Sequence, residues 1–210
     1  MRIIAGTYRS RVLATPAGMA TRPTSDRLRE TLFNVLAPRI AGARFLDLYA
    51  GSGAVGIEAL SRGAAQVTFV ERAPAALKAL RQNLDSLGIT EGFEIHAGSV
   101  TRFFRGFGQK RETHEVVFLD PPYEAADEYE ATLGLLGGGD WSPMSPSARD
   151  MGHPSSLLAS GALVIAEHRR KDRLDDRYGG LERTRLLEQG DAALSFYARS
   201  EQRYADGMKA

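Results

Sequence analysis

The sequence predicts an α/β fold, with a parallel sheet that has helices on both of its faces. Short apolar runs alternate with helix-like stretches from residue 45 onward, as is typical of parallel sheets. A glycine-rich turn at 47–56 joins the first such run to a helix, and an Asp-Pro-Pro-Tyr turn at 120–123 ends a later one. A chain of 210 residues, 43% of them hydrophobic, fits one such domain.

The expected elements follow from hydrophobic spacing and from turn residues. Strands are expected at residues 45–49, 66–71, 93–96, 115–120, 162–167, 181–187 and 193–199. Helices are expected at residues 54–62, 73–87 and 127–136, and Gly88 ends the second of them. Twelve of the twenty residues at 137–156 are Gly, Ser or Pro, which predicts a flexible surface loop within a main domain at 45–210.

The first 44 residues are expected to form a small basic extension. Loose alternation of apolar and basic residues at 2–14 predicts two short strands, a β-hairpin, and N-cap residue types before an apolar stripe predict a helix at 25–37 that stops before Pro38. The extension holds eight arginines and two acidic residues, a net charge of +6, whereas the whole chain carries only +1. Arginines such as Arg9 and Arg11 therefore become candidates for contact with nucleic-acid phosphates.

Composition excludes several classes of protein. The chain has no cysteine, which excludes disulfides, iron–sulfur clusters, thiolate zinc sites and a cysteine nucleophile. No apolar run approaches the roughly 20 residues that span a bilayer, and the N-terminus lacks the apolar region of a signal peptide. We therefore expect a cytoplasmic protein with no membrane partner and no metal site.

The glycine turn fits two kinds of cofactor. Gly51-x-Gly53-x-x-Gly56 matches the dinucleotide fingerprint, and Glu71 lies twenty residues after Gly51, where a dehydrogenase holds ribose hydroxyls. Asp47, however, stands four residues before the first glycine, where a carboxylate would repel a pyrophosphate. A ligand with a positive centre and no phosphate suits Asp47 better, and S-adenosylmethionine is such a ligand.

On this interpretation, Asp47 reaches the methionine end of the cofactor and Glu71 accepts hydrogen bonds from both ribose hydroxyls. Ser99, after the third strand, is the candidate for contact with the adenine amine. The remaining residues of the turns that we expect to line the cofactor are Tyr49, Gly51, Ser52, Gly53, Arg72 and Val100.

The second turn predicts chemistry on an exocyclic amine. Pro121 and Pro122 fix the backbone and remove two N–H donors, so that Asp120 and the local carbonyls can only accept the hydrogens of a planar amine. Accepting them directs the nitrogen lone pair at a methyl group, and Tyr123 is expected to stack on the base. Adenine N6 and guanine N2, in DNA or RNA, fit this turn equally well.

With these two turns and its N-terminal residues, the chain resembles a known family, the RsmD-type guanine-N2 methyltransferases of bacterial 16S ribosomal RNA. The matching stretches are RIIAGTYRSRVL at 2–13, RPTSDRLRETLFNVL at 22–36, FLDLYAGSGAVGIEALSRGA at 45–64, FVE at 69–71 and DPPY at 120–123. The departures are Ser99, where the family often has an acidic residue, and the long loop at 137–156.

The resemblance implies a Rossmann-like, seven-stranded class I methyltransferase fold. It also implies methyl transfer from S-adenosylmethionine to N2 of guanine 966 of 16S ribosomal RNA, in an assembling 30S particle, with Arg22, Thr24 and Arg27 at the mouth of the active site.

Three other hypotheses about the function also fit parts of the sequence. An adenine-N6 methyltransferase acting on DNA or RNA fits the same Asp-Pro-Pro-Tyr turn. A nicotinamide oxidoreductase fits the glycines and Glu71. A non-catalytic RNA-binding assembly factor would use the basic extension alone, but it leaves the Asp-Pro-Pro-Tyr turn unexplained.

Overall fold

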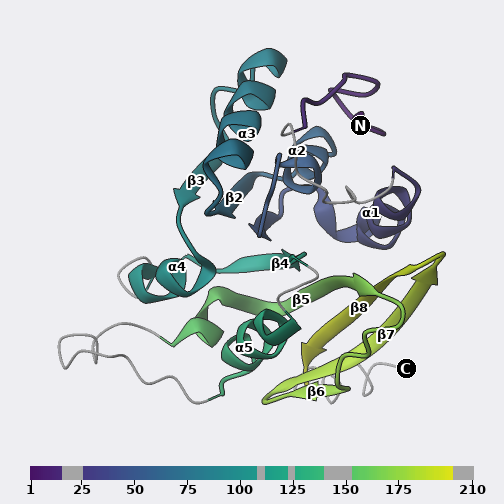
Figure 1. The fold of residues 1–210 in the computed structure, drawn as a ribbon, viewed down its shortest axis with the longest axis vertical. Helices are drawn as coiled ribbons and strands as arrows, with labels where there is room; N and C mark the ends of the chain where they lie inside the picture. Colours follow the sequence, from purple (N-terminus) through teal and green to yellow (C-terminus); the bar gives the residue numbers. More distant parts are fainter. Residues whose placement is uncertain (16–25, 108–111, 123–125, 140–152, 201–210) are drawn as a thin grey trace. The chain divides into compact units, whose positions relative to one another are not determined.

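A computed structural model describes residues 1–15, 26–107, 112–122, 126–139 and 153–200 (Figure 1). The chain divides into two compact units, Met1–Ser99 and Val100–Ala210, and each is described by itself.

The first unit is built on three parallel strands. β2 pairs with β1 on one side and with β3 on the other, and Asp47 lies opposite Phe69 while Glu71 lies opposite Ala97. The polar groups at 47 and 71 therefore stand at or near the carboxyl ends of neighbouring strands. The elements of this unit are α1 (Asp26–Ile40), β1 (Arg44–Leu48), α2 (Ala54–Ser61), β2 (Gln66–Glu71), α3 (Pro74–Leu87) and β3 (Phe93–Ala97).

The helix of the extension continues past Pro38, where the sequence predicted its end. Pro38 lacks the N–H that would bond to the carbonyl of Asn34, but Asn34 is exposed, so water can satisfy that carbonyl. Ile40 is 4% exposed, and burying its side chain favours one more turn of helix. The apolar stripe of α1 is otherwise as expected, and Phe33 stacks on Phe45 of β1 with ring centroids 6.4 Å apart.

The second unit combines one parallel strand pair with antiparallel strands. β4 runs parallel to β5, β5 is antiparallel to β8, β8 to β7, and β7 to β6. Its elements are α4 (Val100–Phe107), β4 (His114–Leu119), α5 (Ala126–Leu136), the short 3₁₀ helix η2 (Pro154–Leu157), β5 (Leu158–Arg169), β6 (Arg177–Tyr178), β7 (Leu181–Gln189) and β8 (Ala192–Arg199).

All seven strands expected from residue 45 onward are present, but the sequence analysis missed three elements of the described residues. α4 is only eight residues long, with Phe103 and Phe104 buried side by side, and so short an apolar pair gives little periodicity. β6 has two residues, and η2 begins within the predicted loop at 137–156 and ends one residue beyond it, at the buried Leu157. Residues 140–152 of that loop lie outside the described residues.

The N-terminal segment, residues 1–14, is bound to α2 and α3 by hydrogen bonds and does not form two regular strands. Its ends do pair as the hairpin prediction requires, at an antiparallel bridge between Arg2 and Val12, with backbone hydrogen bonds from Ile3 to Arg11 (2.9 Å), from Ser10 to Ile3 (2.9 Å) and from Leu13 to Met1 (3.0 Å), but the pairing is too short to form two strands. Several other backbone groups of the segment form hydrogen bonds with side chains of helix α2. Ser61 Oγ accepts from the amide of Tyr8 (3.0 Å) and donates to the carbonyl of Ala5 (2.6 Å).

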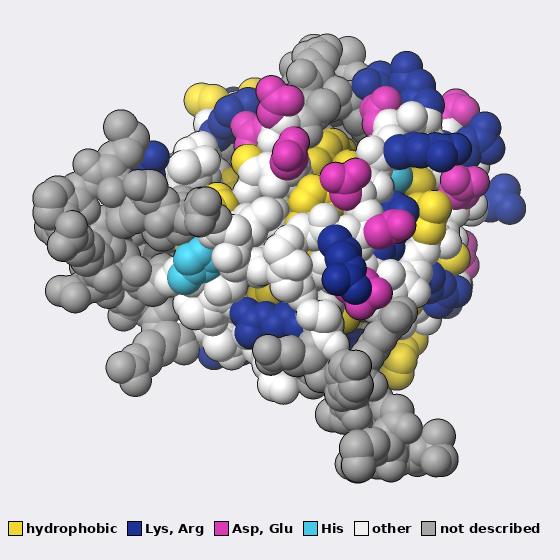
Figure 2. Space-filling model, turned by 90° about the horizontal axis from the view of Figure 1, so that it is seen from below, with side chains coloured by type: hydrophobic (Ala, Val, Ile, Leu, Met, Phe, Trp, Pro, Cys, Tyr) yellow, Lys and Arg dark blue, Asp and Glu magenta, His cyan; other side chains and the backbone are white. Residues whose placement is uncertain are grey.

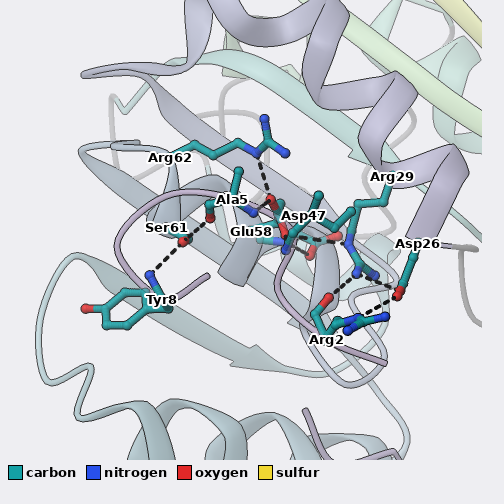
Figure 3. A network of polar contacts seen from close by, with 11 residues as sticks. Arg2, Ala5, Tyr8, Asp26, Arg29, Asp47, Glu58, Ser61 and Arg62 are labelled. Atoms are coloured by element: carbon teal, nitrogen blue, oxygen red, sulfur yellow. Dashed lines mark hydrogen bonds and ion pairs between the residues drawn. The ribbon is translucent and has the colours of Figure 1, made fainter. Parts of the chain in front are cut away.

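Glu58 of α2 is the centre of these contacts (Figure 3). Its carboxylate accepts hydrogen bonds from the amides of Ile4 (2.8 Å) and Ala5 (3.0 Å) and from Nε of Arg62 (2.7 Å). Arg29 of α1 lies on its other side, with Nε 3.7 Å from Oε2, and both side chains are fully buried. One carboxylate thus joins the N-terminal segment, α1 and α2.

Arg29 does not belong to the phosphate-binding surface that the charge of the extension suggested. Its Nη2 donates to Asp26 (3.0 Å) and to the carbonyl of Arg2, while Glu58 balances its charge. The excess of +6 in the extension therefore overstates the charge that is available to a ligand, because tertiary partners neutralise part of it.

We expect the substitution Glu58→Gln to destabilise the protein by about 3–5 kcal/mol, because it removes the buried carboxylate beside Arg29 and leaves that arginine with Asp26, whose side chain is 47% exposed. The amide of Gln also turns an N–H₂ group toward an N–H donor of the N-terminal segment. Denaturant unfolding measures the change, and Glu91→Gln, at an exposed position, is the matched control. A loss of less than about 1 kcal/mol would show that the network contributes no more than a surface ion pair.

Candidate functional site

The glycine turn between β1 and α2 has an unusual backbone. Gly51 (φ +57°) and Gly53 (φ +80°) both adopt the left-handed conformation that glycine tolerates, and so does Tyr49 (φ +62°). The amide of Gly53 donates to the carbonyl of Ala50 (2.8 Å), which closes the turn. Three left-handed residues within five positions reverse the chain sharply from strand into helix.

The three glycines serve two different purposes. A Cβ on Gly53 would lie 2.2 Å from Cδ1 of Leu80, and one on Gly56 would lie 2.3 Å from Cε1 of Phe69. These two glycines allow α2 to pack closely on its neighbours. A Cβ on Gly51 would meet nothing within 4 Å, so Gly51 is the glycine that faces open space.

Glu71 lies directly beside Gly51. One carboxylate oxygen accepts from the amide of Gly51 (2.8 Å), and the other accepts from the amides of Arg72 (2.8 Å) and Ala73 (2.7 Å). Three backbone amides thus fix the orientation of a carboxylate next to the open side of the turn. Two amides already use the acceptor positions of one oxygen, so Oε2, which accepts from Gly51 alone, keeps a lone pair for a ligand hydroxyl.

Asp47 lies under the first turn of α2. It is 2% exposed, and its Oδ2 accepts from the amide of Gly56 (2.9 Å). Burial raises the pKa of Asp47 from 3.8 to about 7, with a smaller contribution from the charge of Glu71, although the hydrogen bond from Gly56 acts in the opposite direction. With a pKa near neutral pH, the protonation state of Asp47 is sensitive to the charge of any group that comes close to it.

Asn83 of α3 connects this turn to the N-terminal segment, a role that the sequence analysis missed. Its Nδ2 donates to the carbonyls of Ser52 (2.9 Å) and Ala14 (3.0 Å), and its Oδ1 accepts from the amide of Ala14 (2.7 Å). A polar residue within the apolar stripe of a helix, as at Asn83 and Glu58, is the signal that could have revealed both connections.

The other predicted cofactor residues are distributed over both units. Ser52 is 8% exposed and Arg72 is exposed. Gly98 donates its amide to the carbonyl of Glu71 (2.8 Å), which brings the neighbouring Ser99 to the same edge of the strands. Val100 is buried as the first residue of α4 and belongs to the second unit.

The Asp-Pro-Pro turn follows β4 in the second unit, as predicted. Asp120 is half-buried directly after the last strand residue, Leu119, while Pro121 is buried and Pro122 exposed. The four apolar residues of β4 before the turn are all buried, so the strand holds Asp120 at a fixed position. Tyr123 lies outside the described residues.

Of the predicted RNA-binding residues, Arg9, Arg11 and Arg27 are exposed. Arg11 also donates from Nη2 to the carbonyl of Ser86 on α3 (2.8 Å), which restricts its direction. Arg22 and Thr24 lie outside the described residues. The roles of these five residues in binding stay predictions.

Within the described part of the chain, no group of three or more His, Asp or Glu side chains could hold a metal ion. Over those same residues, no helix combines the length and the hydrophobicity needed to cross a bilayer.

Solved structures define the class of this fold. A structure from Escherichia coli titled "Putative methyltransferase yhhF" superposes with a TM-score of 0.72 at 35% identity, covering 95% of this chain and 97% of that one. A structure titled "Crystal structure of SMU.776, a putative methyltransferase complexed with SAH" has a TM-score of 0.59 at 12% identity, covering 80% of this chain and 48% of that one, and so shows the fold alone. The fold is the Rossmann-like α/β fold of class I methyltransferases, as the sequence predicted.

Sequence relatives identify the family. Residues 1–198 match the family model described as "Conserved hypothetical protein 95". The chain is 42% identical over 141 residues to "Ribosomal RNA small subunit methyltransferase D" of Escherichia coli K12, covering 67% of this chain and 69% of the relative. It is 32% identical over 197 residues to "Putative rRNA methyltransferase YlbH" of Bacillus subtilis, covering 94% and 98%. The chain belongs to this family, and the RsmD-type resemblance is confirmed.

The raised pKa of Asp47 predicts how stability depends on pH. Because the pKa in the folded state (about 7) lies above the usual 3.8, the stabilising contribution of the protonated carboxyl is complete below about pH 4 and is lost as pH rises through about 7. We expect Asp47→Asn, which cannot ionise, to gain stability relative to wild type by a few kcal/mol between about pH 4 and about pH 8. Denaturant unfolding of the cofactor-free protein at several pH values measures this difference, and a difference independent of pH would contradict it.

Proposed function

We propose that this protein transfers a methyl group from S-adenosylmethionine to the exocyclic N2 amine of guanine 966 in 16S ribosomal RNA, during assembly of the small subunit in the cytoplasm. The observation that carries the proposal is the rigid Asp120-Pro121-Pro122 turn directly after β4, in a chain of this family. The printed name of the relative in Escherichia coli, a small-subunit ribosomal RNA methyltransferase, supports RNA as the substrate.

The residues of the glycine turn fit the cofactor. Gly51 leaves open space beside a fixed Glu71 carboxylate, whose Oε2 has a lone pair left for a ribose hydroxyl. Asp47, which exchanges a proton near neutral pH, suits the cationic methionine end. Ser99 is the proposed contact for the adenine amine. When bound, S-adenosylmethionine supplies the electrophilic methyl group.

The chain's own part in the chemistry is to orient the target amine. Asp120 and the carbonyl of the proline turn accept its two hydrogens, so that the nitrogen lone pair leaves conjugation with the ring and points at the methyl group. Proton loss follows transfer, because the cationic product nitrogen is a far stronger acid than the neutral amine. Asp120 is the proposed acceptor of that proton, and Tyr123 is the proposed stacking partner of the base.

We expect Asp120→Ala to reduce methyl transfer by about a hundredfold or more, since it removes an acceptor that both orients the amine and takes its proton. The assay is labelled methyl transfer to 30S particles, and to free 16S RNA, from a strain that lacks the modification. Affinity for S-adenosylmethionine, measured by calorimetry, should stay unchanged.

Asp127→Ala is the matched control, because Asp127 is an exposed carboxylate in the first turn of α5. Normal transfer by Asp120→Ala would refute the assigned chemistry. Nucleoside analysis of the wild-type product separates the alternatives: N2-methylguanine supports the proposal, whereas N6-methyladenine would favour the adenine enzyme.

A second prediction concerns the cofactor. Glu71→Gln should weaken binding of S-adenosylmethionine by about 10- to 100-fold, as expected for losing hydrogen bonds to a charged acceptor. Glu91→Gln is the control at an exposed carboxylate, and unfolding curves separate lost contacts from a disturbed turn. The wild-type protein should not bind NADH, and tight NADH binding without binding of S-adenosylmethionine would favour the oxidoreductase.

A further inference from the structure

The second unit contains a basic hollow that the proposed function does not yet use. It has a volume of about 580 Å³ and lies between the end of β5, the loop that follows it, and β7. Among its eight lining residues, four are cationic and one is acidic; the lining consists of His168, Arg170, Lys171, Arg173, Leu174, Arg183, Leu186 and Glu188. We call these residues the β5–β7 hollow.

The loop that supplies three of the cations, residues 170–176, is held in place at both ends. The amide of Arg170 donates to the carbonyl of Asp191 (2.8 Å), and that of Asp172 donates to the carbonyl of Arg169 (2.9 Å). At the other end, Asp175 accepts at its carbonyl from the hydroxyl of Tyr197 (2.9 Å) and donates from its amide to the hydroxyl of Tyr178 (3.0 Å). The cations are therefore presented on an ordered backbone.

Three of the four cations are free to meet a ligand. Arg170, Lys171 and Arg173 are exposed, and within the described parts of the chain they have no carboxylate at ion-pair distance. Two of the three acidic side chains of this loop are paired, since Asp172 lies 2.6 Å from Nε of Arg169 and Asp176 pairs with Arg183, whereas Asp175 is exposed.

The remaining lining groups do not cancel this charge. Glu188 contributes one carboxylate to the rim. His168 is 3% exposed, with Nε2 2.9 Å from Oγ of Ser195, and burial together with the nearby Arg183 lowers its pKa, so it is neutral at neutral pH. Figure 2 shows the face of the molecule that is turned down in Figure 1, with Lys and Arg side chains and several Asp and Glu side chains among them.

The arrangement suits an extended anion rather than a single small one. A volume of about 580 Å³ is far larger than one phosphate ion fills, and exposed cations are typical of contacts to backbone phosphates. Leu186 lines the same hollow and is 43% exposed, one of two large hydrophobic residues so exposed in the described chain. An apolar side chain beside arginines suits the sugar and base faces of a nucleotide strand.

We propose that the β5–β7 hollow binds the phosphodiester backbone of the RNA substrate, as a contact separate from the basic extension. The proposal rests on RNA being the substrate, and it adds a second region that determines affinity. Arg170, Lys171 and Arg173 neutralise phosphates, and Leu186 contacts the strand between them.

The test is a triple variant, Arg170→Gln, Lys171→Gln and Arg173→Gln. The control removes the same charge from other exposed cations, Lys78→Gln, Arg81→Gln and Arg185→Gln. Binding of fluorescent single-stranded poly(U) RNA is measured between about 50 and 200 mM salt. For single strands each neutralised phosphate contributes about 0.7 to the slope of log affinity against log salt, so we expect the hollow variant to lose about 2 from that slope.

At low salt the hollow variant should bind RNA at least about tenfold more weakly than the control variant, with unchanged unfolding and unchanged affinity for S-adenosylmethionine. The proposal is overturned if the hollow variant keeps the wild-type slope and affinity, or if the control variant loses as much. Poly-glutamate is tested in the same way. If it binds the wild-type protein as tightly as poly(U) does, and if its affinity falls as much in the hollow variant, the hollow would be assigned to an acidic protein. Inorganic pyrophosphate that displaces poly(U) at equal concentration would assign it to a small free anion.

Failure of the proposed function is recognised separately. Wild-type protein that transfers no methyl group to 30S particles or 16S RNA would refute the proposed reaction, whereas the poly(U) measurement needs no turnover and decides the hollow by itself.

Discussion

The buried carboxylate of Glu58 is the interaction on which the first unit depends. It satisfies two amides of the N-terminal segment and balances Arg29 and Arg62, all from one position on a helix of eight residues. Two residues earlier on the same helix, Gly56 donates its amide to Asp47. α2 is therefore held by one carboxylate on the side of the extension and by another under the glycine turn. A movement of α2 would disturb the exposed arginines of the extension and the proposed cofactor residues together.

The elements whose periodicity is local could be predicted from the sequence, and those that depend on distant partners could not. Seven strands and the helices α2, α3 and α5 follow from short apolar runs and from Gly88, which adopts φ +70° at the end of α3. The passage of α1 through Pro38 depends on the burial of Ile40, which a pattern does not encode. The ends of the N-terminal segment pair with each other, as its alternation predicts, but three amides between them bond to the side chains of Glu58 and Ser61 instead. Sequence separation of more than fifty residues hides such competition from any local rule.

The candidate site shows the same division. The spacing of Gly51 and Glu71 predicted two groups that the structure brings within hydrogen-bond distance. The charge count did not predict which cations are available, because the fully buried Arg29 counts as much as the exposed Arg9. The net negative charge of residues 45–210 likewise conceals the excess of cationic over acidic side chains among the residues that line the β5–β7 hollow. Net charge measures a sum, whereas a phosphate responds to the few side chains within a Debye length of about 8–10 Å.

The same physical reasoning separates the two cofactors that the glycine turn could hold. Glu71 fits both of them, since each contains a ribose. Asp47 does not fit both cofactors equally, because burial already raises its pKa to about 7 and the charge of Glu71 adds to that effect. An anionic pyrophosphate at the N-terminus of α2 would raise the pKa of Asp47 further. It would bind well there only while the Asp47 carboxyl is protonated, because the ionised carboxylate would repel it. A sulfonium and an ammonium would lower the pKa and stabilise the carboxylate. A cationic ligand would therefore stabilise the ionised form of Asp47, which burial and the charge of Glu71 disfavour, whereas the phosphates of a dinucleotide would disfavour it further.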